Sequence, residues 1–144
     1  MERPIRIMFV CTGNSARSQM AEAFCRVLGQ RRVEAKSAGT EPKGLNPNAV
    51  RVMQERGIDI SNHRSEGLDV AEASEMDYLI TVCGNAEERC PVLPAGVMRI
   101  HWPLEDPAAA TGCPEHVLEV FRRTRDEIEA RVLSFLARLG EPCP

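Results

Sequence analysis

Long apolar runs and blocks of like charge are both missing from this sequence of 144 residues. No segment approaches the roughly 18 apolar residues that a membrane-spanning helix needs, and the first residues lack the apolar stretch of a signal peptide. The net charge is only −3, and no run of Lys or Arg resembles a patch for nucleic acid or lipid. We therefore expect a cytoplasmic protein that binds neither nucleic acid nor membrane.

Metal-site spacings, internal repeats and low-complexity segments are absent as well. A chain of this length can build one proper core without disulfides or metals, so we expect a single domain over residues 1–144 and a monomer. Six cysteines remain to be explained. In a reducing compartment we expect them to be catalytic, redox-active or buried, and not joined in structural disulfides.

The most informative segment is Cys11–Ser18, which reads Cys-Thr-Gly-Asn-Ser-Ala-Arg-Ser and follows an apolar run. A loop that leads from a strand into a helix directs several backbone N–H groups at one point, and the helix dipole adds positive charge there. We expect Gly13 to allow a tight turn and Arg17 to fork onto two oxygens of a tetrahedral oxyanion. The same field favours the thiolate of Cys11, to which Ser18 can donate a hydrogen bond. The segment predicts an anion cradle that also activates a nucleophile.

Strands and helices are predicted to alternate along the chain. Short apolar runs predict four strands, over residues 5–10, 33–37, 76–82 and 97–101. Helical spacing of apolar residues predicts three helices, over residues 19–28, 48–56 and 114–139. The apolar face of the first of these helices is expected to consist of Met20, Phe24, Val27 and Leu28. The alternation predicts an α/β fold with a four-stranded open parallel sheet and helices on both faces.

Three candidate residues follow different predicted strands. Ligands of such sheets bind at the carboxyl ends of the strands, so segments that follow different strands can converge there. Cys11 follows the first strand, Cys83 follows the third, and Asp106 lies in the loop after the fourth. Asp106 is a candidate proton donor to an oxygen that leaves the oxyanion, and a plain Asp-Pro turn with Pro107 is the alternative.

Cys83 and Cys90 bracket a short segment with Gly84 and Pro91 at its ends. If the segment is helical, its seven steps separate the thiols by roughly 10 Å along the axis at ~1.5 Å per residue. A disulfide needs Cα atoms within roughly 7 Å, so oxidation of this pair would have to unwind the segment. Gly84 and Pro91 make it a poor helix that can melt at modest cost. The alternative is a pair of buried, inert cysteines.

These motifs together resemble the thioredoxin-coupled arsenate reductases of the low-molecular-weight tyrosine phosphatase fold. A Cys-x5-Arg motif alone is typical of phosphatase-like chemistry in general, whereas its combination with a cysteine pair and an Asp-Pro is far more specific. The resemblance runs through nearly the whole chain. The matching segments are Cys11-Thr-Gly-Asn-Ser-x-Arg-Ser-Gln-Met-Ala-Glu22, Ser37-Ala-Gly39, Asn46-Pro47, Asp59-Ile-Ser-Asn-His63, Val82-Cys83, Cys90-Pro91, His101-Trp102 and Asp106-Pro107-Ala108.

The resemblance implies one catalytic domain that reduces arsenate to arsenite. Cys11 would attack arsenate held by the loop amides and Arg17, while Asp106 helps hydroxide to leave. Cys83 would then attack the sulfur of Cys11 and expel arsenite, and Cys90 would attack Cys83. Reduced thioredoxin would reopen the Cys83–Cys90 disulfide, and no metal or organic cofactor is required. The residues implied to bind the oxyanion or support the loop are Thr12, Gly13, Asn14, Ser15, Ala16 and Ser18.

The same resemblance leaves open whether the chain binds a potassium ion. Some members of the family hold this ion at positions that match Asn14, Glu22, Ser37 and Glu66. Such members have Asp at the last position, and the extra methylene of Glu66 can spoil or reshape the site. Three other cysteines match nothing in the scheme. Cys25 is expected to pack on the first helix and Cys143 to be a free thiol, and no role follows for Cys113.

Two other functions stay open. A low-molecular-weight protein tyrosine phosphatase would use the same loop and the same Asp, but would hydrolyse its covalent intermediate with water. Such phosphatases place aromatic residues after the Asp-Pro, whereas Ala108-Ala109-Ala110 follows here and the chain has one Tyr and one Trp. A weak phosphatase side activity is expected in any case, because the cradle cannot readily distinguish phosphate from arsenate. A non-enzymatic oxyanion or redox sensor would need an interaction surface, of which the sequence gives no obvious sign.

Overall fold

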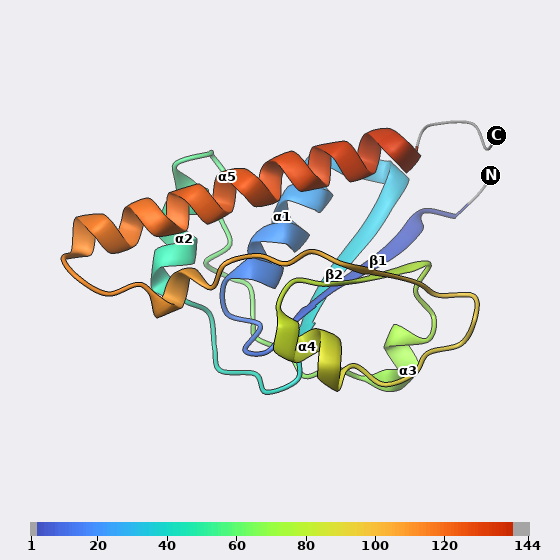
Figure 1. The fold of residues 1–144 in the computed structure, drawn as a ribbon. Helices are drawn as coiled ribbons and strands as arrows, with labels where there is room; N and C mark the ends of the chain where they lie inside the picture. Colours follow the sequence, from blue (N-terminus) through green and yellow to red (C-terminus); the bar gives the residue numbers. More distant parts are fainter. Residues whose placement is uncertain (1–2, 140–144) are drawn as a thin grey trace.

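A computed structural model describes residues 3–139 of the chain. Its centre is a sheet of four strands, all of them parallel to their neighbours, in the order β2-β1-β3-β4 (Figure 1). The strands are β1 (Ile5–Cys11), β2 (Val33–Gly39), β3 (Tyr78–Thr81) and β4 (Met98–His101). The predicted α/β fold with a four-stranded parallel sheet is confirmed.

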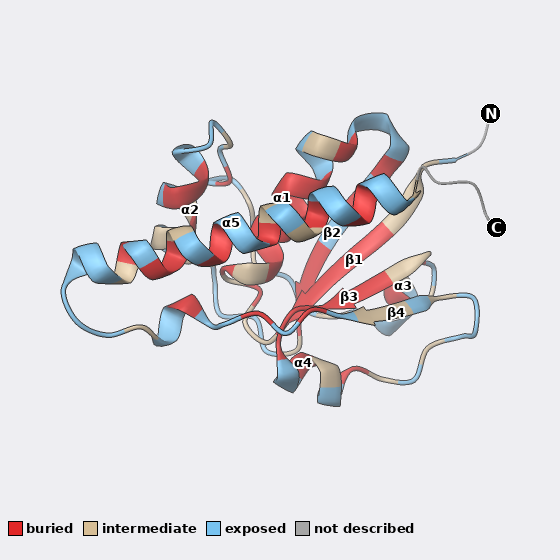
Figure 2. Cartoon of the chain, turned by 45° about the horizontal axis from the view of Figure 1, so that its top comes forward, coloured by how far each residue is buried: buried red, intermediate tan, exposed pale blue. Residues whose placement is uncertain are grey.

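Helices cover both sides of this sheet (Figures 1 and 2). The long helix α5 packs against α1 on one side, with α2 beside them, and the short helix α4 lies on the other side near β1 and β3. Ile7, Met8, Phe9 and Val10 of β1 are fully buried on both faces of the strand, as expected for a strand at the centre of a parallel sheet. The helices are α1 (Arg17–Gly29), α2 (Pro47–Gln54), α3 (Val70–Ala73), α4 (Gly84–Arg89) and α5 (Pro114–Leu139).

The register of the sheet brings the ends of its strands together. Cys11, the last residue of β1, pairs with Gly39 at the end of β2, and Val10 pairs with Thr81 at the end of β3. The loops that leave β1, β2 and β3 therefore start at the same edge of the sheet.

Some sequence predictions need correction. The third strand was expected over residues 76–82 but is shorter, because it pairs with only four residues of β1. Val27 was expected on the buried face of the first helix but is half exposed. Val27 instead lines an open hollow together with Gly57 and Glu129. Helix α3 was not predicted, although Asp69 caps its first N–H groups.

None of the helices within residues 3–139 combines the length and the apolar content that crossing a bilayer requires.

Candidate active site

The loop between β1 and α1 wraps around the sulfur of Cys11. The backbone N–H of Asn14 donates to Sγ at 3.1 Å, and Oγ of Ser18 lies 2.9 Å from the same sulfur. The side-chain amide of Asn14 donates to Oγ of Ser18 at 2.8 Å, which leaves the Ser18 hydroxyl hydrogen free to point at the sulfur. The predicted contact between Ser18 and Cys11 is confirmed.

Asn14, and not Gly13, carries the unusual backbone conformation of the loop. Its φ is 47°, in the left-handed region that Asn tolerates better than most residues. Gly13, expected to allow a tight turn, is not in the left-handed region, but little space is left for a side chain there, since a Cβ would lie 3.3 Å from Oγ of Ser15. Asn14 is further held by Gln19, whose amide donates to its side-chain oxygen at 3.1 Å.

The end of β2 presses directly on this loop. A Cβ at Gly39 would lie 2.6 Å from the carbonyl oxygen of Thr12 and 2.9 Å from the backbone nitrogen of Asn14. Only glycine fits at such distances, because both neighbours are backbone atoms that cannot move aside. Gly39 therefore lets the second strand support the loop from behind.

Arg17 and Asp106 meet at one side of the loop. The Arg17 guanidinium donates to the carbonyl of Leu104 at 3.2 Å and lies 3.8 Å from a carboxylate oxygen of Asp106. Asp106 also accepts a hydrogen bond from the N–H of Ala108 at 3.0 Å, so it caps the turn that follows it. The two sequence interpretations of Asp106, a turn residue and a group of the site, are geometrically compatible.

Cys11, Cys83 and Asp106 line one cleft of about 350 Å³, so the predicted convergence of three strand ends is confirmed. Two lining residues, Lys43 and Asn85, were missed. Asn85 lies two residues after a singled-out cysteine, but Lys43 carries no sequence signal because only the path of the loop brings it to the cleft. The full lining is Cys11, Thr12, Gly13, Ser15, Ala16, Arg17, Lys43, Cys83, Asn85, Asp106 and Ala108.

Cys83 and Cys90 occupy opposite ends of α4. Cys83 is the N-cap residue and accepts a hydrogen bond from the N–H of Ala86 at 3.3 Å, while Oγ1 of Thr12 lies 3.3 Å from its sulfur. Cys90 is the C-cap, is buried, and does not line the cleft. Burial raises the pKa of the Cys90 thiol above its usual value. The segment between the two cysteines is helical, as the predicted separation of their sulfurs along a helix axis requires.

The match to a known family is nearly complete. The model of low molecular weight phosphotyrosine protein phosphatases matches residues 6–143. The chain belongs to this family. The chain is also 49% identical over 135 residues to a protein named arsenate reductase from Shouchella clausii, with 94% of this chain and 96% of that protein covered.

Solved structures of the same family resemble the fold closely. One is described as an arsenate reductase in the phosphate binding state, with a TM-score of 0.78, 35% identity and coverage of 94% of this chain and 99% of the other. Another is a thioredoxin-dependent arsenate reductase of Corynebacterium glutamicum, with a TM-score of 0.74 and 27% identity. Its alignment covers 98% of this chain and 66% of the other.

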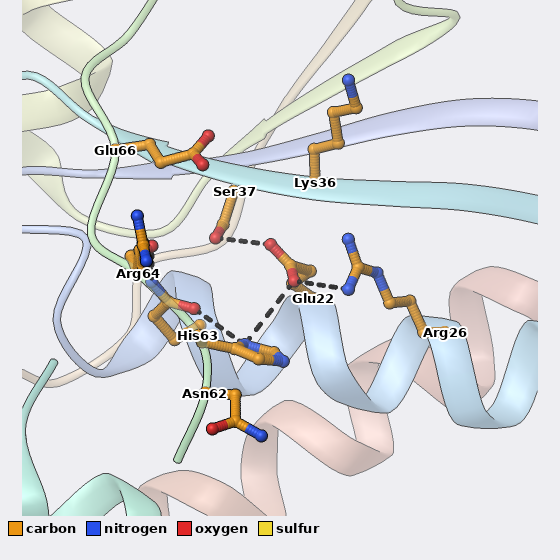
Figure 3. Close-up of a pocket in the computed structure, with 9 residues that line it drawn as sticks. Glu22, Arg26, Lys36, Ser37, Asn62, His63, Arg64 and Glu66 are labelled. Atoms are coloured by element: carbon orange, nitrogen blue, oxygen red, sulfur yellow. Dashed lines mark hydrogen bonds and ion pairs between the residues drawn. The ribbon is translucent and has the colours of Figure 1, made fainter. Parts of the chain in front are cut away.

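Three of the four residues of the potassium hypothesis, Glu22, Ser37 and Glu66, line a second, polar cavity of about 380 Å³ (Figure 3), whereas Asn14 does not line it. Glu22 is the central residue there. Its carboxylate accepts a hydrogen bond from Ser37 at 2.7 Å and lies 3.2 Å from the guanidinium of Arg26 and 3.6 Å from Nδ1 of His63.

The side-chain oxygen of Asn14 is also engaged by other groups. The side-chain oxygen of Asn14 accepts hydrogen bonds from Gln19 at 3.1 Å and from the backbone N–H of Glu66 at 2.8 Å. These bonds use both of its lone pairs, and Arg26 already brings a positive charge to Glu22. Asn14 and Glu22, two of the four expected ligands, are therefore engaged by other groups, and we assign the ion no part in the chemistry.

Cys25 and Cys113 do not line the cleft. Burial raises the pKa of Cys25 to about 12, which keeps this thiol protonated and inert, and its predicted burial on the first helix is confirmed. Cys113 is exposed. Cys143, expected to be a free thiol, lies outside the described residues.

Proposed function

We propose that this chain reduces arsenate to arsenite through Cys11, Cys83 and Cys90, and that thioredoxin reopens the Cys83–Cys90 disulfide. The observation that carries the proposal is the cleft in which Cys11 and Cys83 face the same space, while Cys90 ends the helix that Cys83 begins. The names of the relatives support arsenate as the substrate, and that of the Corynebacterium glutamicum protein supports thioredoxin as the reductant. We expect the chain to act as a cytoplasmic monomer.

The first step is nucleophilic attack on arsenic. The Cys11 thiolate, which accepts hydrogen bonds from Ser18 and the loop, forms a bond to arsenic. Arg17, held by Leu104, forks onto the remaining oxygens, and one arsenate oxygen leaves as water with a proton supplied by Asp106. Arsenic remains in the +5 state in this intermediate, because the step exchanges an oxygen ligand for a sulfur ligand.

The second step is the reduction. The thiolate of Cys83 attacks the sulfur of Cys11, and the electron pair of the bond between sulfur and arsenic stays on arsenic. Arsenite leaves in the +3 state, and the two sulfurs are oxidised together to a disulfide. Cys83 is prepared for this role by the N–H of Ala86 and by the Thr12 hydroxyl, both 3.3 Å from its sulfur.

The third step regenerates the thiolate of Cys11. Cys90 attacks the sulfur of Cys83, Cys11 leaves as a thiolate, and a Cys83–Cys90 disulfide results. Thioredoxin, a dithiol protein, then reduces this disulfide by the same exchange. The oxidation of one dithiol provides the two electrons that arsenate requires, so the cycle balances.

The second candidate is the phosphatase activity after which the family is named. Hydrolysis would use Cys11, Arg17 and Asp106, and Cys83 and Cys90 would have no role in the reaction. The cleft lining also contains no aromatic side chain within the described part of the chain, and Ala108, directly after the Asp-Pro, lines it instead. We therefore expect only slow hydrolysis of aryl phosphates.

The decisive experiment measures NADPH consumption with arsenate, thioredoxin and thioredoxin reductase. Wild type should consume NADPH only when arsenate is present, and Cys83→Ser should not, although it should still hydrolyse a small aryl phosphate. Cys113→Ser is the matched control, because Cys113 is exposed and does not line the cleft, and it should behave as wild type. Brisk phosphate hydrolysis without arsenate-dependent NADPH consumption would make the chain a phosphatase.

A further inference from the structure

A carboxylate on the helix between the relay cysteines is held by the neighbouring strands β3 and β4 of the sheet. Oγ1 of Thr81, at the end of β3, donates to Glu87 at 2.7 Å, and Nε of Arg99 on β4 lies 3.5 Å from the same carboxylate oxygen. Nδ1 of His101 lies 2.8 Å from Oγ1 of Thr81 and completes the cluster. We call Thr81, Glu87, Arg99 and His101 the Glu87 latch.

Arg99 also binds the backbone on both sides of Cys90. Its guanidinium donates to the carbonyl oxygen of Glu87 and, at 3.5 Å, to that of Pro91. The carbonyl of Glu87 is among the last of α4, which have no partner within the helix. One side chain of β4 therefore holds the end of the helix and the residue that follows Cys90.

These contacts oppose the formation of the Cys83–Cys90 disulfide. The two cysteines cap the same six-residue helix, so their sulfurs cannot meet until that helix unwinds. A helix of this length is far below the ~12–15 residues at which isolated helices become marginally stable, and its persistence depends on tertiary contacts. The Glu87 latch provides such contacts, at the end of α4 that carries Cys90.

The latch also acts on the charge state of Cys90. Burial raises the pKa of this thiol, the positive charge of Arg99 counteracts that effect, and the negative charge of Glu87 adds to it. Glu87 lies on α4 and departs when the helix unwinds, whereas Arg99 lies on β4 and stays in the sheet. Opening therefore separates Glu87 from Arg99 and removes the burial that raises the pKa of the Cys90 thiol.

We propose that Arg99, acting on Glu87, is a positioning residue for the last thiol exchange: it keeps α4 folded and Cys90 withdrawn until Cys83 has reacted. The proposal rests on the three-cysteine relay. In that exchange the Cys90 thiol loses its proton to solvent and attacks Sγ of Cys83. The bond between Cys11 and Cys83 breaks, its electron pair leaves with Cys11, and no net oxidation occurs.

The test measures how readily the Cys83–Cys90 disulfide forms in the full chain. A Cys11→Ser background isolates the Cys83–Cys90 couple. The protein is equilibrated with mixtures of reduced and oxidised dithiothreitol, and after alkylation the fraction of disulfide is measured by mass spectrometry. Because the latch stabilises the reduced form, Arg99→Gln should favour the disulfide by about tenfold, which is a potential about 30 mV more negative. Arg131→Gln, which removes an exposed Arg paired with Glu127 on α5, should leave the potential unchanged.

A second variant guards against misfolding of the first. Glu87→Gln retains an oxygen that can accept from Thr81 but loses the charge, so it should shift the potential in the same direction, and the double variant should add little to either single change. Hydrogen exchange of the α4 amides should accelerate in both variants. An unchanged potential in folded Arg99→Gln and Glu87→Gln would overturn the latch. Absence of any Cys83–Cys90 disulfide in the Cys11→Ser background would instead overturn the relay itself.

Discussion

The hydroxyl of Thr12 lies 3.3 Å from the sulfur of Cys83, where its hydrogen can be donated to a thiolate. A third residue favours this direction. The amide of Asn85 donates to the same hydroxyl oxygen at 2.8 Å, and an amide N–H has no acceptor capacity. The single hydrogen of Thr12 is then free for the sulfur, where it stabilises a thiolate. The loop that holds the oxyanion thus also prepares the second nucleophile.

Thr12→Val should slow arsenate reduction by about tenfold or more, because a hydrogen bond to a charged group contributes about 1.5–3 kcal/mol. Thr12→Ser, which retains the hydroxyl, should keep most of the activity. The measurement is the rate of arsenite formation in a single turnover of each variant. Equal rates for the Val and Ser variants would mean that the hydroxyl does not assist Cys83.

Asp106→Asn should keep the turn intact, because Asn can accept the hydrogen bond that the N–H of Ala108 donates. The variant cannot donate a proton as a carboxylic acid does, so turnover should fall by about 10² to 10⁴. Aryl phosphates provide the check. A phosphate with a poor leaving group should lose most of its turnover and one with a good leaving group much less, whereas equal losses would contradict the role of proton donor.

Cys90→Ser should release one arsenite per chain and then stop. Its Cys83 can still attack Cys11, but the disulfide between them cannot be passed on. Mass spectrometry should find a Cys11–Cys83 disulfide, and steady NADPH consumption should be absent. Continued turnover of this variant with thioredoxin would show that Cys90 is dispensable for the relay.

Glu55 makes the stability of the fold depend on acidity. Hydrogen bonds from Arg122 and Arg125 lower the pKa of Glu55 from 4.5 to about 2. A carboxyl whose pKa is lower in the folded chain stabilises it above the unfolded pKa, and that contribution disappears as the pH falls through the folded pKa. The melting temperature of Glu55→Gln should therefore lie below that of wild type near neutral pH, and the gap should close between about pH 4.5 and 2.

The control for this prediction is Glu127→Gln, which removes an exposed pair with Arg131 one turn away on the same helix. Its melting temperature should stay near that of wild type, because exposed pairs contribute little. If the difference in melting temperature between wild type and Glu55→Gln stays the same at pH 2, titration of the Glu55 carboxyl in wild type is not its cause.

Much of the fold was predictable because its signals are local. The apolar run of β1 and the periodicity of α5 depend on neighbouring residues, and both elements lie where the sequence indicates them. The end of β3 is different, since it depends on pairing with β1, and the exposure of Val27 depends on the open hollow that the fold leaves beside α1. Such features arise from packing and have no local signature.

The site divides in the same way. The loop from Cys11 to Ser18 and the cysteine pair were recognisable because their spacing alone carries chemistry. Lys43 enters the cleft from a loop whose path only the fold determines, and the turn of the loop falls on Asn14 where Gly13 was the natural expectation. The contacts of Glu87 could not be predicted, because Arg99 is twelve residues away along the chain and lies on β4, whereas Glu87 lies on α4.

The position of Cys11 and Cys83 relative to the sheet has a consequence for temperature. Cys11 ends the central strand and pairs with β2, so the oxyanion chemistry takes place on a stiff platform. In the proposed relay the last exchange melts α4 in every cycle, and breaking its hydrogen bonds and the contacts of Glu87 absorbs heat. Cooling should therefore slow that exchange more steeply than the attack on arsenic. The unwinding of α4 should therefore limit turnover at low temperature, whereas the attack on arsenic should limit it at higher temperature.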